Sequence, residues 1–213
     1  MIAIVDYGLG NLGSVAKAFR QVGAPTVLTA DRDALRSASA LVLPGDGAFG
    51  AAMDELRQRS LVPVLLEAEA AGTPILGICV GMQLFFDASE EHGSHAGLGL
   101  LRGRVRRFGP GLPVPHMGWN QLRWRCPHAV RAEVADGAHV YFVHSYYAEA
   151  APEDTVATSD YGVEFPAIVA RRSVIGMQFH PEKSQAVGLK LVEAFVAIVN
   201  ERRAGRLSAR VVR

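Results

Sequence analysis

Short apolar runs alternate with stretches of helical spacing through the first half of the chain. Apolar runs bounded by turn residues predict buried strands, whereas apolar positions repeating every three or four residues predict amphipathic helices. Because the two kinds of element alternate, we expect an α/β fold with a mostly parallel central sheet and helices on both faces. The predicted strands are residues 2–6, 25–29, 40–43 and 74–78, and the predicted helices are residues 12–22, 53–71 and 81–86.

The second half of the chain has a different pattern. Between residues 105 and 170, short strand-like pieces alternate with turns, which predicts a smaller antiparallel flank beside the central sheet. A buried strand at 174–179 and an amphipathic helix at 186–203 follow. Since no internal repeat, low-complexity tract or linker interrupts the pattern, we expect one domain spanning residues 1–213. The pieces of the flank are residues 121–124, 140–143, 155–159 and 167–171.

The composition narrows the function classes. The 22 Lys and Arg nearly balance the 21 Asp and Glu, so the charge predicts binding to neither nucleic acid nor a membrane surface. Two cysteines are too few for a disulfide framework, and no signal-like or membrane-spanning apolar run is found, so we expect a cytoplasmic protein. The basic residues near the C-terminus are interpreted as the solvated end of a helix, where positive charge is favourable. They are Arg202, Arg203, Arg206, Arg210 and Arg213.

A glycine motif follows the first predicted strand. Gly8, Gly10 and Gly13 form the pattern GxGxxG, and Asp31 lies near the end of the second predicted strand. The arrangement is close to that of a dinucleotide-binding fingerprint, which would make the protein a nicotinamide or flavin enzyme. The alternative is a tight strand-to-helix turn with Asn11 capping the helix. A lone GxGxxG is a weak signal, so we favour the turn and expect no cofactor.

A second glycine motif surrounds a cysteine. Gly77, Cys79 and Gly81 form the pattern GxCxG between a predicted strand and a predicted helix, the cysteine version of a nucleophile elbow. A sharp turn strains the nucleophile's backbone, the glycines remove clashing side chains, and the helix N-terminus favours the thiolate. The alternative is a buried core cysteine. Cys126 has no flanking glycines and no helix start, and is interpreted as structural or incidental.

His180 is the candidate base for Cys79. It follows the buried strand 174–179, and the C-terminal ends of parallel strands share one sheet edge, so the two side chains should emerge together. Pro181 favours an extended backbone at His180, and residues two apart in an extended chain point the same way. Glu182 is therefore expected to orient the imidazole and complete a Cys-His-Glu triad. The alternative is a strand-end histidine beside an incidental surface glutamate.

The turn at residues 44–47, Pro-Gly-Asp-Gly, follows another buried strand and should lie on the same sheet edge. Its backbone N–H groups, together with that of Val80, are candidates for an oxyanion hole. Taken alone, the segment would be interpreted as an ordinary turn.

Together these motifs resemble those of the class I glutamine amidotransferases, with residues 77–83 (GICVGMQ), 44–47 (PGDG) and 180–182 (HPE) in the family's order over nearly the whole chain. Within that family, three further segments are similar to the glutaminase subunits of imidazole glycerol phosphate synthases, enzymes of histidine biosynthesis. They are residues 6–11 (DYGLGN), 115–120 (PHMGWN) and 141–146 (YFVHSY).

The resemblance implies that Cys79 attacks the carboxamide of glutamine, releasing ammonia and leaving a thioester that water hydrolyses to glutamate. It implies no cofactor and no metal, and a cyclase subunit that forms a heterodimer with this chain and receives the ammonia. The family often has a small aliphatic residue where this chain has Asp46, whose side chain we expect to point to solvent. The implied oxyanion and glutamine-binding residues are Gly45, Asp46, Gly47, Val80, Gln83, Ser145 and Tyr146. The implied partner-interface residues are Trp119, Asn120, Tyr141 and Lys183.

Three other functions remain open. A stand-alone cysteine hydrolase would be active without a partner and would not need the glutamine-binding residues. A catalytically inactive binding protein would lack a member of the triad, and none is missing here. A glutaminase for anthranilate, aminodeoxychorismate or pyridoxal phosphate synthesis would share the triad, but the residues around Trp119 argue against it.

Overall fold

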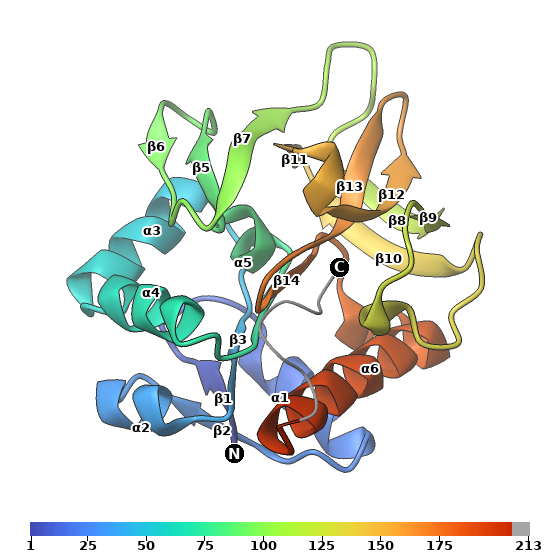
Figure 1. The fold of residues 1–213 in the computed structure, drawn as a ribbon. Helices are drawn as coiled ribbons and strands as arrows, with labels where there is room; N and C mark the ends of the chain where they lie inside the picture. Colours follow the sequence, from blue (N-terminus) through green and yellow to red (C-terminus); the bar gives the residue numbers. More distant parts are fainter. Residues whose placement is uncertain (206–213) are drawn as a thin grey trace.

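A mixed sheet runs through the centre of the protein, in a computed structural model that describes residues 1–205 (Figure 1). Within those residues its eight strands lie in the order β2-β1-β3-β4-β14-β13-β12-β9. The first five are parallel and the last three are antiparallel, which confirms the expected α/β class. In the same order, the strands are Thr26–Thr29, Ile2–Val5, Ala40–Leu43, Ile75–Ile78, Val174–Met177, Glu164–Arg171, Thr155–Asp160 and Arg123–Trp124.

Helices cover both faces of the parallel part (Figure 1). On one side α1 (Leu12–Gln21) packs against α6 (Gln185–Arg203), with the rings of Phe19 and Phe195 in edge-to-face contact at 6.3 Å. On the other side lie α2 (Arg32–Ser37), α3 (Phe49–Gln58) and α4 (Val62–Ala70). Strands β1, β3, β4 and β14 are buried along their whole length, because both of their faces are covered.

The flank consists of two smaller sheets, and its predicted composition was largely wrong. One has the order β11-β7-β5-β6 and the other pairs β10 with β8 antiparallel. Their strands are Tyr146–Ala150, Leu101–Arg107, Phe86–Ser89 and His95–Ala96, then His139–His144 and His116–Gln121. The pieces predicted at 155–159 and 167–171 belong to the antiparallel strands β12 and β13 of the central sheet, and only 140–143 belongs wholly to a small sheet, within β10. Because β10 ends at His144 and β11 begins at Tyr146, the chain passes from one small sheet to the other beside the C-terminal ends of the central strands.

Two predicted helices were wrong in extent. The helix predicted at 53–71 is two helices, because the chain breaks at Ser60, whose φ is +55°, and restarts in α4 with Pro63 in its first turn. The helix predicted at 81–86 is α5 (Val80–Gln83), and Phe86 already belongs to β5. Helix α2 and strands β5, β6, β7 and β11 were not predicted, and the strand predicted at 121–124 shares only Gln121 with β8. Short 3-10 helices are η1 (Ala129–Arg131), η2 (Pro152–Asp154) and η3 (Pro181–Lys183).

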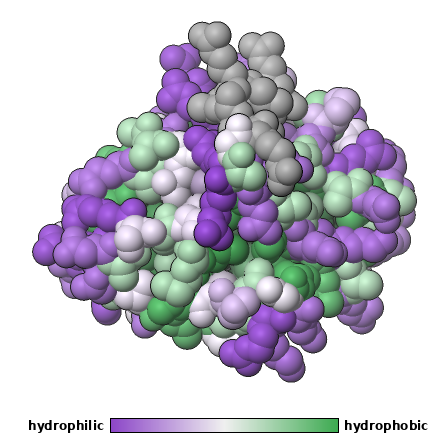
Figure 2. Space-filling view, turned by 60° about the horizontal axis from the view of Figure 1, so that its bottom comes forward, coloured by the Kyte–Doolittle hydropathy of each residue, from purple (hydrophilic) through white to green (hydrophobic). Residues whose placement is uncertain are grey.

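The surface carries mixed polarity. Figure 2 shows hydrophilic side chains around the margins of one face, with smaller hydrophobic areas between them. Arg202 and Arg203 form the basic last turn of α6, as expected, and the Arg202 guanidinium lies against Gly72. Arg206, Arg210 and Arg213 lie outside the described residues. Over residues 1–205, no helix has the length and apolarity needed to cross a membrane.

Candidate active site

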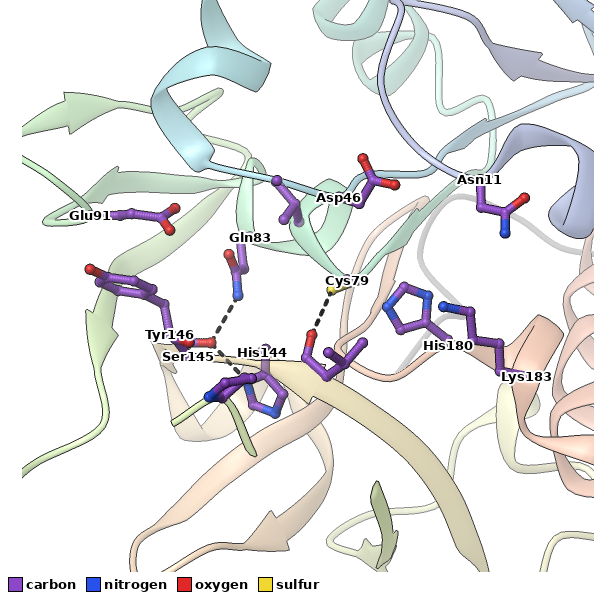
Figure 3. Close-up of a pocket in the computed structure, with 14 residues that line it drawn as sticks. Asn11, Asp46, Cys79, Gln83, Glu91, His144, Ser145, Tyr146, His180 and Lys183 are labelled. Atoms are coloured by element: carbon purple, nitrogen blue, oxygen red, sulfur yellow. Dashed lines mark hydrogen bonds between the residues drawn. The ribbon is translucent and has the colours of Figure 1, made fainter. Parts of the chain in front are cut away.

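A cavity of about 270 Å³ opens where the C-terminal ends of the parallel strands meet the two small sheets (Figure 3). It brings together residues from motifs that lie far apart in the sequence. All of the predicted catalytic and substrate-binding residues line this cavity except Gly45 and Glu182. Lys183, which was predicted to meet a partner, lines it as well. The lining residues are Asn11, Asp46, Gly47, Cys79, Val80, Gln83, Glu91, Pro115, Val143, His144, Ser145, Tyr146, His180 and Lys183.

Cys79 occupies the turn between β4 and α5. Its φ of +55° and ψ of −113° lie outside the regions that non-glycine residues normally adopt, as expected for an elbow. The neighbouring glycines are required by close backbone packing: a Cβ on Gly81 would lie 1.8 Å from the carbonyl oxygen of Leu43. The elbow thus directs the sulfur into the cavity (Figure 3). Because α5 spans a single turn, its macrodipole contributes little to the thiolate.

His180 lies beside the thiol and is held by Glu182. Its Nδ1 is 2.8 Å from Oε1 of Glu182, and both side chains are buried, at 8% and 2% exposure. A carboxylate can only accept, so Nδ1 carries the proton and Nε2 is left for Cys79. Burial alone would lower the pKa of His180, but its interactions with the Cys79 sulfur and the Glu182 carboxylate raise that pKa to about 10. The geometry therefore favours a charged imidazolium next to the sulfur.

The loop at residues 44–47 packs directly against the elbow. A Cβ on Gly45 would lie 2.6 Å from the backbone nitrogen of Gly81, so the two turns meet backbone to backbone. On its inner side the buried hydroxyl of Tyr7 donates to the carbonyl of Pro44 at 2.7 Å. Burial, and then the negative charges of Asp46 and Cys79, raise the pKa of Tyr7 above its usual value, so the phenol stays protonated.

The side chain of Asp46 does not point freely to solvent, contrary to the expectation from the sequence. The residue is exposed, as predicted, but its Oδ1 accepts the N–H of Gly10 at 2.9 Å rather than pointing freely to solvent. The carboxylate thereby ties the loop at 44–47 to the N-terminal glycine turn. Its short side chain reaches this N–H because Gly10 approaches the loop closely, with a φ of +99°.

The N-terminal glycine turn has the geometry of a strand-to-helix connection. Asn11 caps α1, its side chain accepting the N–H of Ser14 at 3.2 Å. The acidic residue of the apparent fingerprint, Asp31, caps α2 by accepting the N–H of Ala34 at 2.7 Å. Both observations agree with the interpretation of this segment as a tight turn.

Two polar residues at the site were not picked out from the sequence. Glu91 lines the cavity, and its Oε2 accepts the N–H of Phe49, the first residue of α3, at 2.7 Å. Gln178 is fully buried behind Cys79. The two-residue period that linked His180 to Glu182 also places Gln178 on the same face, so that signal could have found it. Glu91 lies in a turn, where no pattern marks it.

Two buried histidines connect the cavity to β8. The carbonyl of Tyr146 can only accept, so Nδ1 of His144 donates to it at 2.8 Å. Nε2 of His144 is then the acceptor for Nδ1 of His116 at 3.1 Å, and Asn120 donates to Nε2 of His116 at 3.2 Å. Burial lowers the pKa of His144 to about 3 and that of His116 to about 4, so both rings are neutral near pH 7.

The residues predicted to meet a partner do not all face outward. The exposed Trp119 stands opposite Tyr141 across the β8–β10 pair, with ring centroids 6.0 Å apart. Lys183 is exposed at the edge of the cavity. Asn120 is turned inward, where its Nδ2 also donates to the carbonyl of Asp160 at 2.7 Å. In the part of the chain that the structure describes, no group of three or more His, Cys, Asp or Glu side chains is arranged to hold a metal ion.

Comparison with known proteins identifies the family. A family model described as "Glutamine amidotransferase class-I" matches residues 3–198. A protein of Geobacillus kaustophilus named "Imidazole glycerol phosphate synthase subunit HisH" is 51% identical over 210 residues, covering 95% of this chain and 99% of its own length. A protein of Lactiplantibacillus plantarum with the same name is 52% identical over 202 residues, covering 94% and 97%.

Solved structures share the fold at lower sequence identity. One described as a glutamine amidotransferase superposes with a TM-score of 0.74 at 18% identity, covering 93% of this chain and 98% of its own. A putative GMP synthase protein from Thermoplasma acidophilum superposes with a TM-score of 0.72 at 21% identity, covering 96% of each chain. The central sheet and its flank are therefore an architecture common to these proteins.

Proposed function

The chain belongs to the class I glutamine amidotransferases, and we propose that it hydrolyses glutamine with Cys79 as nucleophile, His180 as base and Glu182 as the residue that orients the base. The observation that carries this proposal is the convergence of a strained, cavity-facing cysteine and a carboxylate-bound histidine at one cavity. A triad of this kind supplies an activated nucleophile and a proton carrier for the leaving group.

The first half of the reaction forms a thioester. With the proton of the Cys79 thiol held on Nε2 of His180, whose pKa is raised, Sγ attacks the carboxamide carbon of glutamine, so that a C–S bond forms and the carbonyl electron pair moves to oxygen. The backbone N–H of Val80 and those of the loop at 45–47 stabilise this oxyanion. His180 then returns the proton to the nitrogen, the C–N bond breaks and ammonia leaves.

The second half frees the sulfur of Cys79. His180 removes a proton from water as the water oxygen attacks the thioester carbon, and a second oxyanion forms at the same N–H groups. When this intermediate collapses, the C–S bond breaks, the sulfur leaves as thiolate and glutamate is released. His180 keeps the proton taken from water, which restores the imidazolium beside the sulfur of Cys79. Each step needs the ring in one orientation, which the bond to Glu182 supports.

The polar groups at the far end of the cavity suit the amino-acid end of glutamine. Both hydrogens of the Gln83 amide are committed, to the carbonyl of Tyr146 at 2.9 Å and to Oε1 of Gln178 at 3.0 Å, which leaves its Oε1 to accept from a ligand. The Glu91 carboxylate adds a negative charge at this end, favourable for an α-ammonium group. Ser145 and Tyr146 complete this end of the cavity (Figure 3).

The ammonia is passed to a cyclase subunit for the formation of imidazole glycerol phosphate. The chain, one domain over residues 1–213, forms a cytoplasmic heterodimer with that subunit. Support comes from the names of the relatives at 51% and 52% identity, which call them subunits of imidazole glycerol phosphate synthase. The exposed Trp119 and the cavity-edge Lys183 lie on the face that meets the cyclase. Asn120 supports this face indirectly, because its side chain holds β8 in place through the hydrogen bond to the carbonyl of Asp160.

A reconstitution assay tests the proposal. Glutamate formation is measured for the chain alone and with the cyclase subunit of a relative and its nucleotide substrate, in buffer free of ammonium salts. We expect the cyclase to raise glutamine hydrolysis and glutamine to support imidazole glycerol phosphate formation. If cyclase changes neither quantity, the pathway assignment is wrong.

Two cysteine variants test the nucleophile. Cys79→Ala should abolish glutamine hydrolysis while leaving the circular dichroism spectrum unchanged. The matched control is Cys126→Ala: the Cys126 thiol contacts the carbonyl of Thr155 and does not line the cavity, so this variant should keep the wild-type rate. Glutamine hydrolysis retained by Cys79→Ala would refute the nucleophile assignment.

A further inference from the structure

Gln178 is a buried polar residue in contact with the sulfur of Cys79. It follows β14 and is fully buried, and its backbone N–H donates to the carbonyl of Ala167 at 2.9 Å. Its side-chain Nε2 lies 3.8 Å from Sγ of Cys79, within hydrogen-bonding range for sulfur. The polar atoms of a buried carboxamide are expected to have hydrogen-bond partners, and the partner of Nε2 here is the sulfur of the candidate nucleophile.

The orientation of the Gln178 amide follows from its neighbours. The carbonyl of Tyr146 can only accept, so the group of Gln83 that lies 2.9 Å from it is the NH₂ group. That same NH₂ lies 3.0 Å from the Gln178 amide and must donate to it, so Oε1 of Gln178 faces Gln83. The NH₂ group of Gln178 is therefore the end that faces the sulfur.

A second contact of the sulfur favours the opposite protonation state. The carbonyl oxygen of Val143 lies 3.9 Å from Sγ and can receive only the S–H proton, so it interacts favourably with the thiol (Figure 3). A hydrogen bond from Gln178 instead becomes stronger when the sulfur ionises, because it is then assisted by charge. The two contacts have opposite effects on ionisation.

We propose that Gln178 is a catalytic residue of this site, whose side-chain N–H donates to Sγ of Cys79 and stabilises the thiolate relative to the thiol. The proposal rests on the proposed role of Cys79 as nucleophile. The same hydrogen bond stabilises the sulfur as the leaving group when the thioester intermediate collapses. Gln83 holds Gln178 in position, so a residue at the glutamine-binding end also sets the donor at the nucleophile.

The test is the pH dependence of alkylation of each cysteine by iodoacetamide, followed by mass spectrometry of the two cysteine peptides. Gln178→Met keeps an unbranched side chain of similar length but has no donor. We expect its Cys79 alkylation midpoint to rise by about one pH unit, and its Cys79 alkylation rate below both midpoints to fall about tenfold. Cys126 is the internal control, since its sulfur lies against Thr155, and its midpoint should not move.

Glutamine turnover provides a readout that a purely structural role would not give. In Gln178→Met, kcat should fall most at low pH, and the deficit relative to wild type should shrink as the pH rises above the new midpoint. An unchanged Cys79 midpoint in the folded variant would overturn the proposal even if the wild-type protein hydrolyses glutamine. If the Cys79 midpoint shifts in Gln178→Met but the wild-type protein has no glutaminase activity, the hydrogen bond from Gln178 to Cys79 is supported and the proposed function is refuted.

A measurement on the unsubstituted side chain covers the case in which Gln178→Met does not fold. In protein labelled with ¹⁵N-glutamine, the side-chain amide resonance of Gln178 should titrate with the Cys79 alkylation midpoint. In Cys79→Ser that titration should disappear. If the chemical shift of the Gln178 side-chain amide does not change around the pH of the Cys79 alkylation midpoint, the proposal is overturned.

Discussion

Lowering the pH should destabilise this protein through its buried histidines. Burial lowers the pKa of His144 to about 3 and that of His116 to about 4, against an ordinary value of 6.5. It also lowers to about 4 the pKa of His128, a buried residue whose Nδ1 accepts the N–H of Val130 in η1. The unfolded chain therefore binds more protons than the folded one at any pH between these values. The free energy of unfolding must then fall as the pH drops below 6.5 and keep falling to the folded-state pKa values.

The size of the effect follows from the width of that window. Between pH 6.5 and 4.5 each of the three rings stays neutral in the folded protein and becomes protonated in the unfolded chain, at about 1.4 kcal/mol per pH unit. The loss is about 2.5 kcal/mol per ring and about 7 kcal/mol in total, comparable to the 5–15 kcal/mol that stabilises a typical domain. His180, whose pKa is raised, is protonated in both states over this window and does not change the result.

Urea denaturation followed by circular dichroism at pH 6.5, 5.5 and 4.5 measures this loss. His116→Gln removes one titrating ring while keeping amide groups for its neighbours, and should reduce the loss by about 2.5 kcal/mol. His139→Gln is the control, because His139 is exposed on β10 and should leave the pH dependence unchanged. A free energy of unfolding that stays flat from pH 6.5 to 4.5 would refute the assignment of these rings as buried and neutral.

Two further predictions concern the site. Glu182→Ala frees the ring of His180 and should lower kcat at least about a hundredfold with little change in KM, as steady-state glutaminase assays would show; a loss confined to KM would contradict the orienting role. Gly81→Ala puts a methyl group 1.8 Å from the carbonyl of Leu43 and should destabilise the fold by several kcal/mol, whereas Gly13→Ala, in an open position on α1, should stabilise it by about 0.5–1 kcal/mol. Thermal unfolding of both variants measures this difference. Equal melting temperatures for Gly81→Ala and Gly13→Ala would contradict the prediction that Gly81 is closely packed.

The sequence predicted the parts of the protein in which local chemistry decides the structure. The strand at Ala40–Leu43 was predicted to the residue, because a strand buried on both faces is a continuous apolar run. The elbow at Cys79 was predictable because only glycine fits beside it. His180 and Glu182 followed from the period of an extended chain. In each case a few neighbouring residues carry the whole constraint.

Features fixed by contacts between distant segments were missed. Residues 53–71 have unbroken helical spacing, yet α3 ends at Gln58 and the backbone turns at Ser60 before α4 begins. The two helices pack against different elements, α3 against α5 and β6 and α4 against α2. The orientation of Gln178 depends on a hydrogen bond to Gln83, 95 residues away, and that of Asp46 on Gly10, 36 residues away. No local pattern records such partners, and Glu91 was missed for the same reason.

The glycines around the site form one backbone-to-backbone stack. A Cβ on Gly10 would meet the backbone nitrogen of Gly45 at 3.5 Å, one on Gly45 would meet the nitrogen of Gly81 at 2.6 Å, and one on Gly81 would meet the carbonyl oxygen of Leu43. In a saturation-mutagenesis scan, Gly45 and Gly81 should therefore tolerate nothing larger, although they lie far apart in the sequence. In the GxGxxG segment, so similar to a pyrophosphate cradle, Gly10 lies against this stack and leaves room for the main chain of the loop at 44–47, whereas Gly13 has nothing within 4 Å.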